Sequence, residues 1–424
     1  MRTLRLGDFG TDVMELQATL LKTNYDPGPV DGIFGQRMAR AVMRVQRNYG
    51  LVPDGVVGAA TYRALERYLL GYDAYTVRRG DTFYSIARRY YTTPALIAAA
   101  NPGVNPNTLQ IGQRITAPYG FNVVDTNIKY TYDILARDIQ GLRARYPFLE
   151  TGSAGKSLLG RDLTYLRLGT GERQVFYNGV HHALEWITAP LLMKFIEEFS
   201  KAYALGTTLS RGYNPRELWR GSSIYILPMV NPDGADLVLN GLRADNPEYQ
   251  NLLRWNNGSA DFSAVWQANN RGVDLNHNYN AAWQSSKDAE AAYGVTGPGP
   301  TRYSGTAPES EPEARAVAEF TRSRDFRLVI AYHSQGRVIY WNFMDMAPPE
   351  GKTIGEAFAA ATGYTLDQTS GIASYAGYKD WFIQRYRRPG YTFEVGLGRN
   401  PVPLAQFDRI YRENLEAMLL AAVI

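Results

Sequence analysis

The chain has 424 residues, which is too long for one ordinary hydrophobic core, so we expect two or three domains. Its composition, 45% hydrophobic and 20% charged, is that of a soluble globular protein. Its net charge of +4 suits attraction to an anionic polymer but is too small and too diffuse to indicate a nucleic-acid partner. The absence of cysteine excludes disulfides and thiolate metal sites, and leaves His, Glu and Asp as the strong zinc ligands.

The N-terminus has no apolar segment typical of a signal peptide, and no stretch of the chain reaches the length of a membrane span. We therefore expect no membrane span and a protein that is cytoplasmic when it is synthesised, unless a signal peptide has been removed. The sequence gives no indication of the oligomeric state.

Residues 1–70 are expected to form a small all-α domain, because apolar residues recur at helical spacing through residues 13–21 and 39–46. A turn phrase occurs twice, as Val30-Asp-Gly-Ile-Phe-Gly35 and as Pro53-Asp-Gly-Val-Val-Gly58. Asp-Gly favours tight turns, so the repeat can be purely structural. The phrasing nevertheless resembles the three-helix peptidoglycan-binding domain found beside many cell-wall hydrolases.

Residues 75–118 predict a strand, two short helices and a second strand. Three phrases are distinctive: Tyr75-Thr-Val-Arg-Arg-Gly-Asp-Thr82, Ala100-Asn-Pro102 and Ile111-Gly-Gln-Arg-Ile115. This βααβ segment resembles a LysM domain, whose groove binds glycans that contain N-acetylglucosamine. No acid–base pair stands out in it, so we interpret the segment as an anchor.

Residues 125–424 alternate apolar runs with helical patterns, which predicts a large α/β domain with a mixed, mostly parallel sheet. His182 and Glu185, then His333, then Glu394 stand at the ends of strand-like apolar runs. Functional residues of open α/β sheets gather outside the carboxyl ends of the strands, so we expect these side chains to converge. Taken singly, each has an ordinary explanation: a helix-capping glutamate, a hydrogen-bonded core histidine or a salt-bridged glutamate.

A further helix is predicted through residues 314–320. The phrase Ser310-Glu-Pro-Glu313 that precedes it predicts a capping box with proline in the first turn. The Gly- and Pro-rich residues 293–308 before this phrase predict a long loop, a candidate rim of the active site.

Five motifs occur in the large domain in the order His182-x-x-Glu185-Trp186, Asn231-Pro-Asp-Gly234, Gly272-Val-Asp-Leu-Asn276, His333-Ser-Gln335 and Thr392-Phe-Glu394. With these motifs the domain resembles a zinc carboxypeptidase of the M14 type, and most of all its bacterial branch of γ-D-glutamyl-L-diamino acid endopeptidases.

The resemblance implies one Zn²⁺ per chain, held by His182, Glu185 and His333, with a fourth position open for water. It also assigns a role to Glu394, which takes a proton from that water and passes it to the leaving amine.

The tyrosine that covers substrate in this family corresponds to Tyr375 or to Tyr378. The family commonly has an arginine after a tryptophan to stabilise the oxyanion, where this chain has Gln267. The resemblance therefore leaves Arg271 and Arg254 as the candidate cations.

Exopeptidases of the family hold the substrate's C-terminal carboxylate with Asn-Arg, where this chain has Asn276 and His277. Histidine lacks the bidentate fork of arginine, which favours an endopeptidase, although His277 can equally be an ordinary core or surface residue. Lys379 falls at the floor of the pocket for the leaving-group residue, where it would attract the side-chain carboxylate of meso-diaminopimelate; the alternative is a solvent-facing lysine. His181 is expected to support the ligands from behind or to lie at the surface.

The sequence thus predicts zinc-dependent hydrolysis of peptidoglycan stem peptides, most of all at the γ-D-glutamyl–meso-diaminopimelate bond, with two modules anchoring the enzyme to the wall or to the spore. Two alternatives stay open at this point: a conventional carboxypeptidase that removes C-terminal residues, and a catalytically impaired wall- or spore-binding protein. The residues do not distinguish a role in sporulation from one in vegetative growth.

Overall fold

The computed structural model describes residues 2–424, which divide into two compact units. One unit comprises the chain up to Leu149 together with Glu197–Thr207, and the other comprises Glu150–Ile196 and Thr208–Ile424. Within residues 2–424, no helix combines the length and the apolar character that crossing a bilayer requires.

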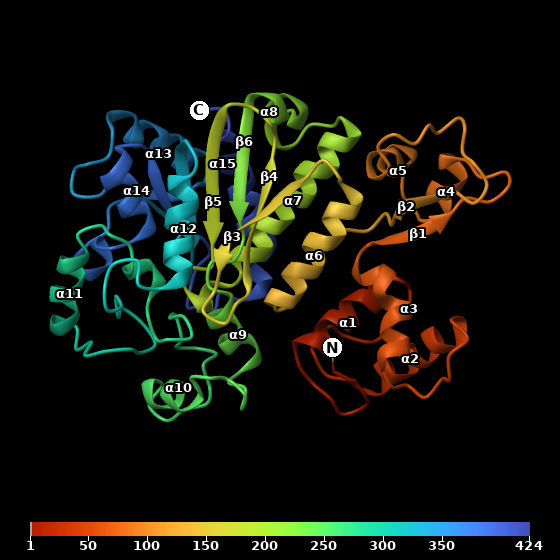
Figure 1. Ribbon diagram of the computed structural model, residues 1–424, viewed down its shortest axis with the longest axis horizontal. Helices are drawn as coiled ribbons and strands as arrows, with labels where there is room; N and C mark the ends of the chain where they lie inside the picture. The colour runs from red at the N-terminus through yellow and green to blue at the C-terminus, as the bar shows by residue number, and fades with distance from the viewer. Residues whose placement is uncertain (1) are drawn as a thin grey trace. The chain divides into compact units, whose positions relative to one another are not determined.

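Three helices open the first unit (Figure 1): α1 (Thr11–Lys22), α2 (Gln36–Asn48) and α3 (Ala59–Leu69). Two buried glutamines hold the repeated Asp-Gly turns. Gln17 Oε1 accepts the backbone N–H of Gly32 at 2.8 Å, and Gln46 Oε1 accepts that of Gly55 at 2.9 Å. Both glycines have a positive φ, 77° and 74°, which other residues adopt only with strain. The repeat therefore has a structural role, since each glutamine ties one turn to the helices.

The βααβ segment follows, as β1 (Tyr72–Thr76), α4 (Phe83–Arg89), α5 (Pro94–Ala100) and β2 (Arg114–Pro118), and α6 (Tyr132–Arg145) comes after it. The two strands pair antiparallel, with Tyr75 opposite Ile115. Asn101 of the Ala-Asn-Pro phrase ties α5 to β2, because its side chain donates to the carbonyl of Thr116 at 2.7 Å and accepts the N–H of the same residue at 2.8 Å. The predicted element order of this segment is confirmed.

The second unit is built on an eight-stranded sheet of order β3-β4-β6-β5-β7-β10-β8-β9. The strands are β3 (Glu150–Lys156), β4 (Asp162–Leu168), β5 (Arg173–Gly179), β6 (Ser222–Leu227), β7 (Phe326–His333), β8 (Val338–Tyr340), β9 (Thr365–Asp367) and β10 (Gly390–Glu394). The four central strands β6, β5, β7 and β10 run parallel, whereas β3, β4 and β8 pair antiparallel. The prediction of a mixed, mostly parallel sheet is confirmed.

Helices and 3₁₀ turns connect the strands. The α-helices are α7 (Thr188–Leu205), α8 (Pro215–Gly221), α9 (Pro232–Asn240), α10 (Tyr249–Trp255), α11 (Trp283–Ala292), α12 (Pro312–Arg322), α13 (Pro349–Thr362), α14 (Tyr378–Tyr386) and α15 (Phe407–Leu420). The 3₁₀ turns are η1 (Ala183–Glu185), η2 (Ser210–Gly212), η3 (Leu275–His277), η4 (Gly371–Ser374) and η5 (Leu404–Gln406).

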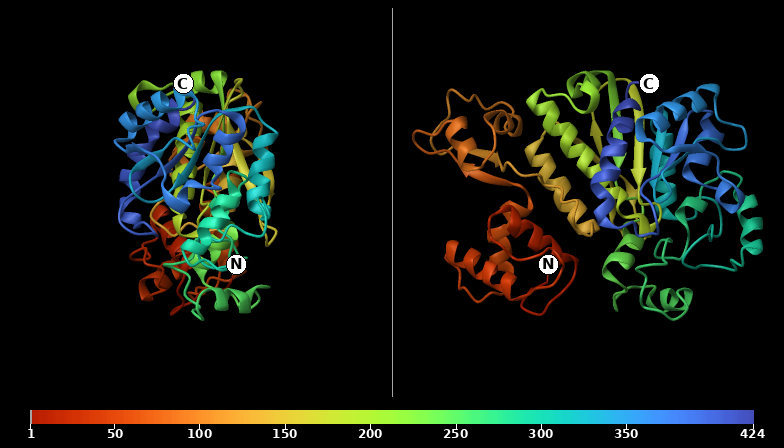
Figure 2. Two further views of the ribbon diagram at one scale, coloured as in Figure 1. Left: turned by 90° about the vertical axis from the view of Figure 1, so that its left-hand side faces the viewer. Right: turned by 180° about the vertical axis from the view of Figure 1, so that it is seen from behind.

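Helices cover both faces of this sheet (Figure 2). Neighbouring residues of β5 show the two sides, because successive side chains of a strand point to opposite faces. The Phe176 ring packs 5.3 Å from Phe320 of α12, whereas the Tyr177 ring lies 6.4 Å from Phe195 of α7 and its hydroxyl donates to the carbonyl of Met418 in α15. Burial on both faces explains why Val175, Phe176 and Tyr177 follow one another without an alternating polar residue.

The helix predicted through residues 314–320 is present, but its capping box is not. Helix α12 begins at Pro312 with Glu311 at the N-cap position, and no side chain caps it. The hydroxyl of Ser310 donates instead to Glu311 Oε1 at 3.0 Å. The capping-box prediction was wrong because it required Ser310 at the N-cap position. Glu311 occupies that position, so Ser310 lies one residue before it.

Candidate metal centre and active site

A strained turn after β5 positions the first two candidate ligands. Val180 has φ 56°, a left-handed conformation that is costly for a β-branched residue and persists only where its surroundings fix it. Thr188 fixes it here, since the threonine hydroxyl accepts the N–H of Val180 at 3.0 Å and donates to the carbonyl of Glu185 at 2.9 Å. The threonine hydroxyl therefore contacts both ends of the segment from Val180 to Glu185, which contains the two candidate ligands.

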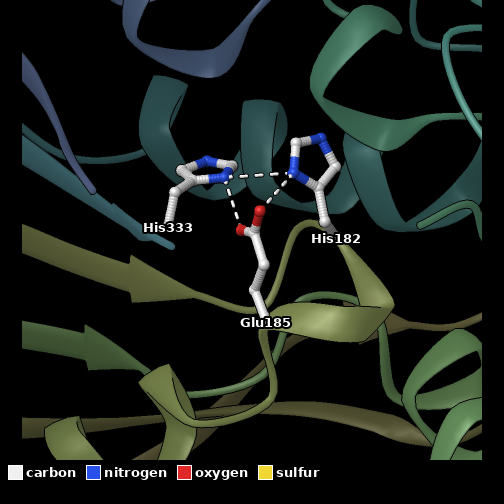
Figure 3. Close-up of side chains that lie close together, drawn as sticks. All are labelled: His182, Glu185 and His333. Atoms are coloured by element: carbon white, nitrogen blue, oxygen red, sulfur yellow. Dashed lines mark hydrogen bonds and ion pairs between the residues drawn. The ribbon is translucent and has the colours of Figure 1, made fainter. Parts of the chain in front are cut away.

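His182, Glu185 and His333 converge at the carboxyl ends of β5 and β7 (Figure 3). His182 Nδ1 lies 3.0 Å from Glu185 Oε1, and His333 Nδ1 lies 2.8 Å from Glu185 Oε2. The two Nδ1 atoms face each other at 3.3 Å. Two imidazole nitrogens and one carboxylate directed at the same point form the donor set of a catalytic zinc site, so the residues fit the predicted metal.

The rear nitrogen of His182 supports this interpretation. His182 Nε2 lies 3.1 Å from Oδ1 of Asp274, whose carboxyl group is buried. The other oxygen of Asp274 accepts the N–H of Arg302 at 2.9 Å. A carboxylate behind a histidine fixes the tautomer that leaves Nδ1 free to bind metal. Asn400 adds a contact to Glu185, with 3.4 Å between its Nδ2 and Glu185 Oε1.

Sequence reasoning missed both supporting residues. Asp274 stood in the Gly272-Val-Asp motif and was the one available signal. It is 92 positions from His182, so only the fold brings the two together.

Neighbouring charges shift the pKa values of Glu185 and His182 more than burial does. Burial raises the pKa of Glu185, but the adjacent His182 and His333 outweigh burial and lower that pKa. Burial lowers the pKa of His182, but the carboxylates of Glu185 and Asp274 outweigh burial and raise it well above its ordinary value. Two ionised carboxylates next to the histidines create a local field that favours a cation.

Glu394 ends β10 beside the ligands, in register with His333 of the neighbouring strand β7. Burial raises the pKa of Glu394 well above its ordinary value, and the nearby Glu185 adds to the increase. A carboxyl group whose pKa is raised in this way binds a proton more readily than an ordinary carboxylate, which suits a group that must accept a proton and later return it.

The two arginines proposed for the oxyanion lie in other contacts. Arg271 pairs with Glu311, with 3.4 Å between Nη1 and Oε2, and Arg254 is exposed and donates to Asn251 at 2.8 Å. Gln267 is connected to the metal ligands instead. Its side-chain oxygen accepts the hydroxyl of Thr301, and this hydroxyl lies 3.4 Å from Asp274 Oδ2.

Asn276 and His277 lie on the 3₁₀ turn η3. Asn276 Oδ1 accepts the N–H of Tyr378 at 3.0 Å. His277 is buried, with Nδ1 3.3 Å from the hydroxyl of Ser286, and burial lowers its pKa. A neutral, hydrogen-bonded histidine does not supply the charged fork that a C-terminal carboxylate requires.

Of the two candidate tyrosines, Tyr378 is excluded by its position. It is fully buried, and its hydroxyl lies 2.9 Å from that of Thr321 in α12, so it cannot swing over a substrate. Tyr375 is only partly buried and precedes the helix. The expectation for Tyr378 was wrong because it faces the core side of α14.

Lys379 does not face solvent. Its side chain is 3% exposed, and the ammonium group donates to the carbonyl of Asn342 at 2.7 Å and to the carboxylate of Asp380. The solvent-facing alternative was therefore wrong, and the positive charge already has a buried partner.

His181 is also buried, which excludes its surface alternative. Its Nε2 lies 2.9 Å from the hydroxyl of Tyr279, and its ring stacks on His333 at 5.6 Å. The ring contact places it next to His333, the position that the other alternative described.

An α/β sheet with two histidines and a glutamate at the carboxyl ends of its central strands defines a metallopeptidase of the carboxypeptidase fold. The chain belongs to the zinc carboxypeptidase family, whose pattern matches residues 135–417. The putative peptidoglycan binding domain matches residues 9–65, and the LysM domain matches residues 75–118.

Two curated relatives are similar over most of their length. Gamma-D-glutamyl-L-diamino acid endopeptidase 1 of Lysinibacillus sphaericus is 41% identical over 395 residues, which cover 81% of this chain and 98% of that protein. The uncharacterized protein YqgT of Bacillus subtilis (strain 168) is 32% identical, over 75% of this chain and 85% of its own.

Among solved structures, thrombin activatable fibrinolysis inhibitor has a TM-score of 0.53 at 17% identity, covering 82% of this chain and 96% of its own. Carboxypeptidase A from Helicoverpa armigera has a TM-score of 0.52 at 19% identity, covering 77% and 78%. Similarity at this level of identity shows the fold alone.

Proposed function

We propose that this metallopeptidase hydrolyses peptidoglycan stem peptides at the bond between γ-D-glutamate and meso-diaminopimelate. The observation that supports this most is the convergence of His182, Glu185 and His333 in a chain 41% identical to a γ-D-glutamyl-L-diamino acid endopeptidase over 98% of that protein. The two additional modules, which match wall-binding families, point to the same substrate.

The three ligands would hold one Zn²⁺ per chain. When bound by these residues, zinc would supply Lewis-acid chemistry: it would polarise the scissile carbonyl and lower the pKa of a water toward neutrality. Asp274 would keep His182 in the tautomer whose Nδ1 is free to bind the metal. Elemental analysis of the purified protein tests this part: the expected result is one zinc per chain, lost with activity on chelation.

Glu394 acts as general base toward the attacking water and then as general acid toward the leaving amine. Its position in register with His333 and its raised pKa support this assignment. Tyr375, at the start of the segment that leads into α14, covers the substrate. For the oxyanion, Arg271 and Arg254 stay the proposed cations, and each would have to leave its present partner.

The substrate's leaving-group side is assigned to Asn276, His277 and Lys379. His277 offers no fork for a C-terminal carboxylate, which supports an endopeptidase over a carboxypeptidase. Lys379 keeps its proposed role as the cation for the side-chain carboxylate of meso-diaminopimelate. Because its charge is paired with the buried carboxylate of Asp380, it would have to leave that partner to contact the substrate.

We propose three domains, residues 1–70, 75–118 and 125–424, with the first two anchoring the enzyme to peptidoglycan at the cell wall or the spore. Tethering raises the local concentration of stem peptides around the active site.

A pair of substrates distinguishes this proposal from a carboxypeptidase. A stem peptide whose C-terminal carboxylate is replaced by an amide should be cut at nearly the rate of the free acid. Loss of cleavage with the amide would establish the carboxypeptidase alternative. No cleavage of either peptide by the zinc-loaded protein would establish the impaired wall-binding alternative.

A further inference from the structure

Helix α2, which Figure 1 labels, has a sequence that contains a row of arginines not used by the peptidase site. All four are exposed, and they follow one another three or four positions apart along one helical face. The four arginines lie along a shallow pocket with a volume of about 430 Å³. Its lining residues are Asp26, Arg37, Arg40, Met43, Arg44 and Arg47. With a rise of ~1.5 Å per residue, the row extends over roughly 15 Å.

The row keeps most of its positive charge. Asp26 pairs with Arg37, and its carbonyl oxygen accepts a weak contact of 3.5 Å from Arg44. Between residues 2 and 424, neither Arg40 nor Arg47 has an ion-pair partner. One carboxylate therefore faces four guanidinium groups.

The buried face of α2 fixes the direction of the row. Met38, Val42 and Val45 are fully buried in the core of the helical module. The arginine side chains on the remaining face consequently stay directed outward, since rotating the helix would expose this apolar face.

The spacing indicates the chemistry of the ligand. Guanidinium groups bind phosphate and carboxylate oxygens through paired N–H donors. Charges repeated every few ångströms suit a polymer with one anionic group per unit rather than a single small anion. No aromatic side chain is among the residues that line the surface, so bases would have nothing to stack on, which disfavours single-stranded nucleic acid.

We propose that the arginine row of α2 binds a linear polyol-phosphate polymer, the kind of phosphodiester polyanion that accompanies peptidoglycan in many walls. This contact would add to the glycan contacts of the modules, and it does not depend on the peptidase reaction.

The test uses the full-length protein and purified poly(glycerol phosphate). The variant Arg40→Gln/Arg44→Gln/Arg47→Gln removes three charges of the row and leaves the Arg37–Asp26 pair intact. The matched control Arg63→Gln/Arg79→Gln/Arg88→Gln removes three exposed charges elsewhere in the two modules. We expect the row variant to bind roughly tenfold more weakly or worse, the combined effect of three exposed charge contacts, and the control to bind like the native protein.

Salt provides a second readout. Binding of the native protein should weaken steeply as salt rises, and the row variant should show a shallower dependence because it releases fewer counterions. Hydrolysis of a soluble stem peptide should be equal in all three proteins, which separates failure here from failure of the proposed peptidase function.

Three results would overturn the proposal. These are an absence of binding by the native protein, an equal loss in the row variant and the control, and tighter binding of poly-glutamate or single-stranded DNA than of the phosphate polymer.

Discussion

Replacing Lys379 with methionine should destabilise the protein, independently of any effect on substrate. The side chains of Lys379 and Asp380 are each 3% exposed, and the ammonium group donates to Asp380 and, at 2.7 Å, to the carbonyl of Asn342. Methionine preserves most of the apolar stem but removes the charge. The carboxylate of Asp380 is then left buried without its partner, which typically costs about 3–5 kcal/mol.

Chemical denaturation, monitored by both fluorescence and circular dichroism, measures this cost. We expect the free energy of unfolding of Lys379→Met to fall by about 3–5 kcal/mol. The double variant Lys379→Met/Asp380→Asn should regain part of the lost free energy of unfolding. Its amide side chain can still accept the hydrogen bond from Gly377, and it leaves no buried charge. Lys352→Met is a matched control. The native Lys352 side chain is 63% exposed and pairs with Glu356 at 3.9 Å. Its replacement should lower the free energy of unfolding by less than about 1 kcal/mol.

Equal stability of Lys379→Met and the native protein would refute the reasoning, since it would mean that Asp380 does not depend on its partner. The comparison also matters for specificity. A slower reaction of Lys379→Met with a diaminopimelate substrate is informative only after its folded fraction has been measured.

Three further predictions concern the metal ligands, the proton carrier and a buried acid. Asp274→Asn should lower zinc affinity about 10–100-fold, measured by competition with a chelator, because His182 loses the carboxylate that orients it; unchanged affinity would exclude that role. Glu394→Gln should retain zinc and fold while kcat falls about 10²-fold or more, and near-native turnover would place the base elsewhere. Glu313 is fully buried, and burial raises its pKa to about 7, so its folded form binds more protons than its unfolded form between the ordinary value of 4.5 and 7. The free energy of unfolding should therefore decrease by about 3 kcal/mol as pH rises through that interval, and Glu313→Gln should remove this decrease; identical pH profiles of the two proteins would contradict the assignment.

The sequence predicted the convergence of His182, Glu185 and His333 because the reasoning needed only local information. Each stands after an apolar run, and the carboxyl ends of parallel strands meet at one edge of a sheet. The fold followed in the same way from the alternation of apolar runs and helical patterns.

Contacts between distant segments could not be predicted in this way. Asp274 supports His182 across 92 positions, and Asn400 reaches Glu185 across 215. Tyr378 was a plausible alternative to Tyr375 until the packing of α14 against Thr321 showed which of the two is fixed in the core.

The buried ion pair between Lys379 and Asp380 could not be predicted from the sequence either. Sequence places the two residues side by side, but neighbours in a chain need not contact each other. The structure shows that both side chains are buried and that the ammonium group donates to Asp380 and to the carbonyl of Asn342. The charge of Lys379 is therefore already compensated.

Mass spectrometry of purified diaminopimelate-type tetrapeptide muropeptides, digested by the zinc-loaded enzyme, tests the central claim most directly. The proposed function predicts that the peptide is cut on the carboxyl side of γ-D-glutamate, releasing diaminopimelate still joined to the terminal D-alanine. Release of D-alanine alone, with diaminopimelate retained on the glycan-linked fragment, would contradict it.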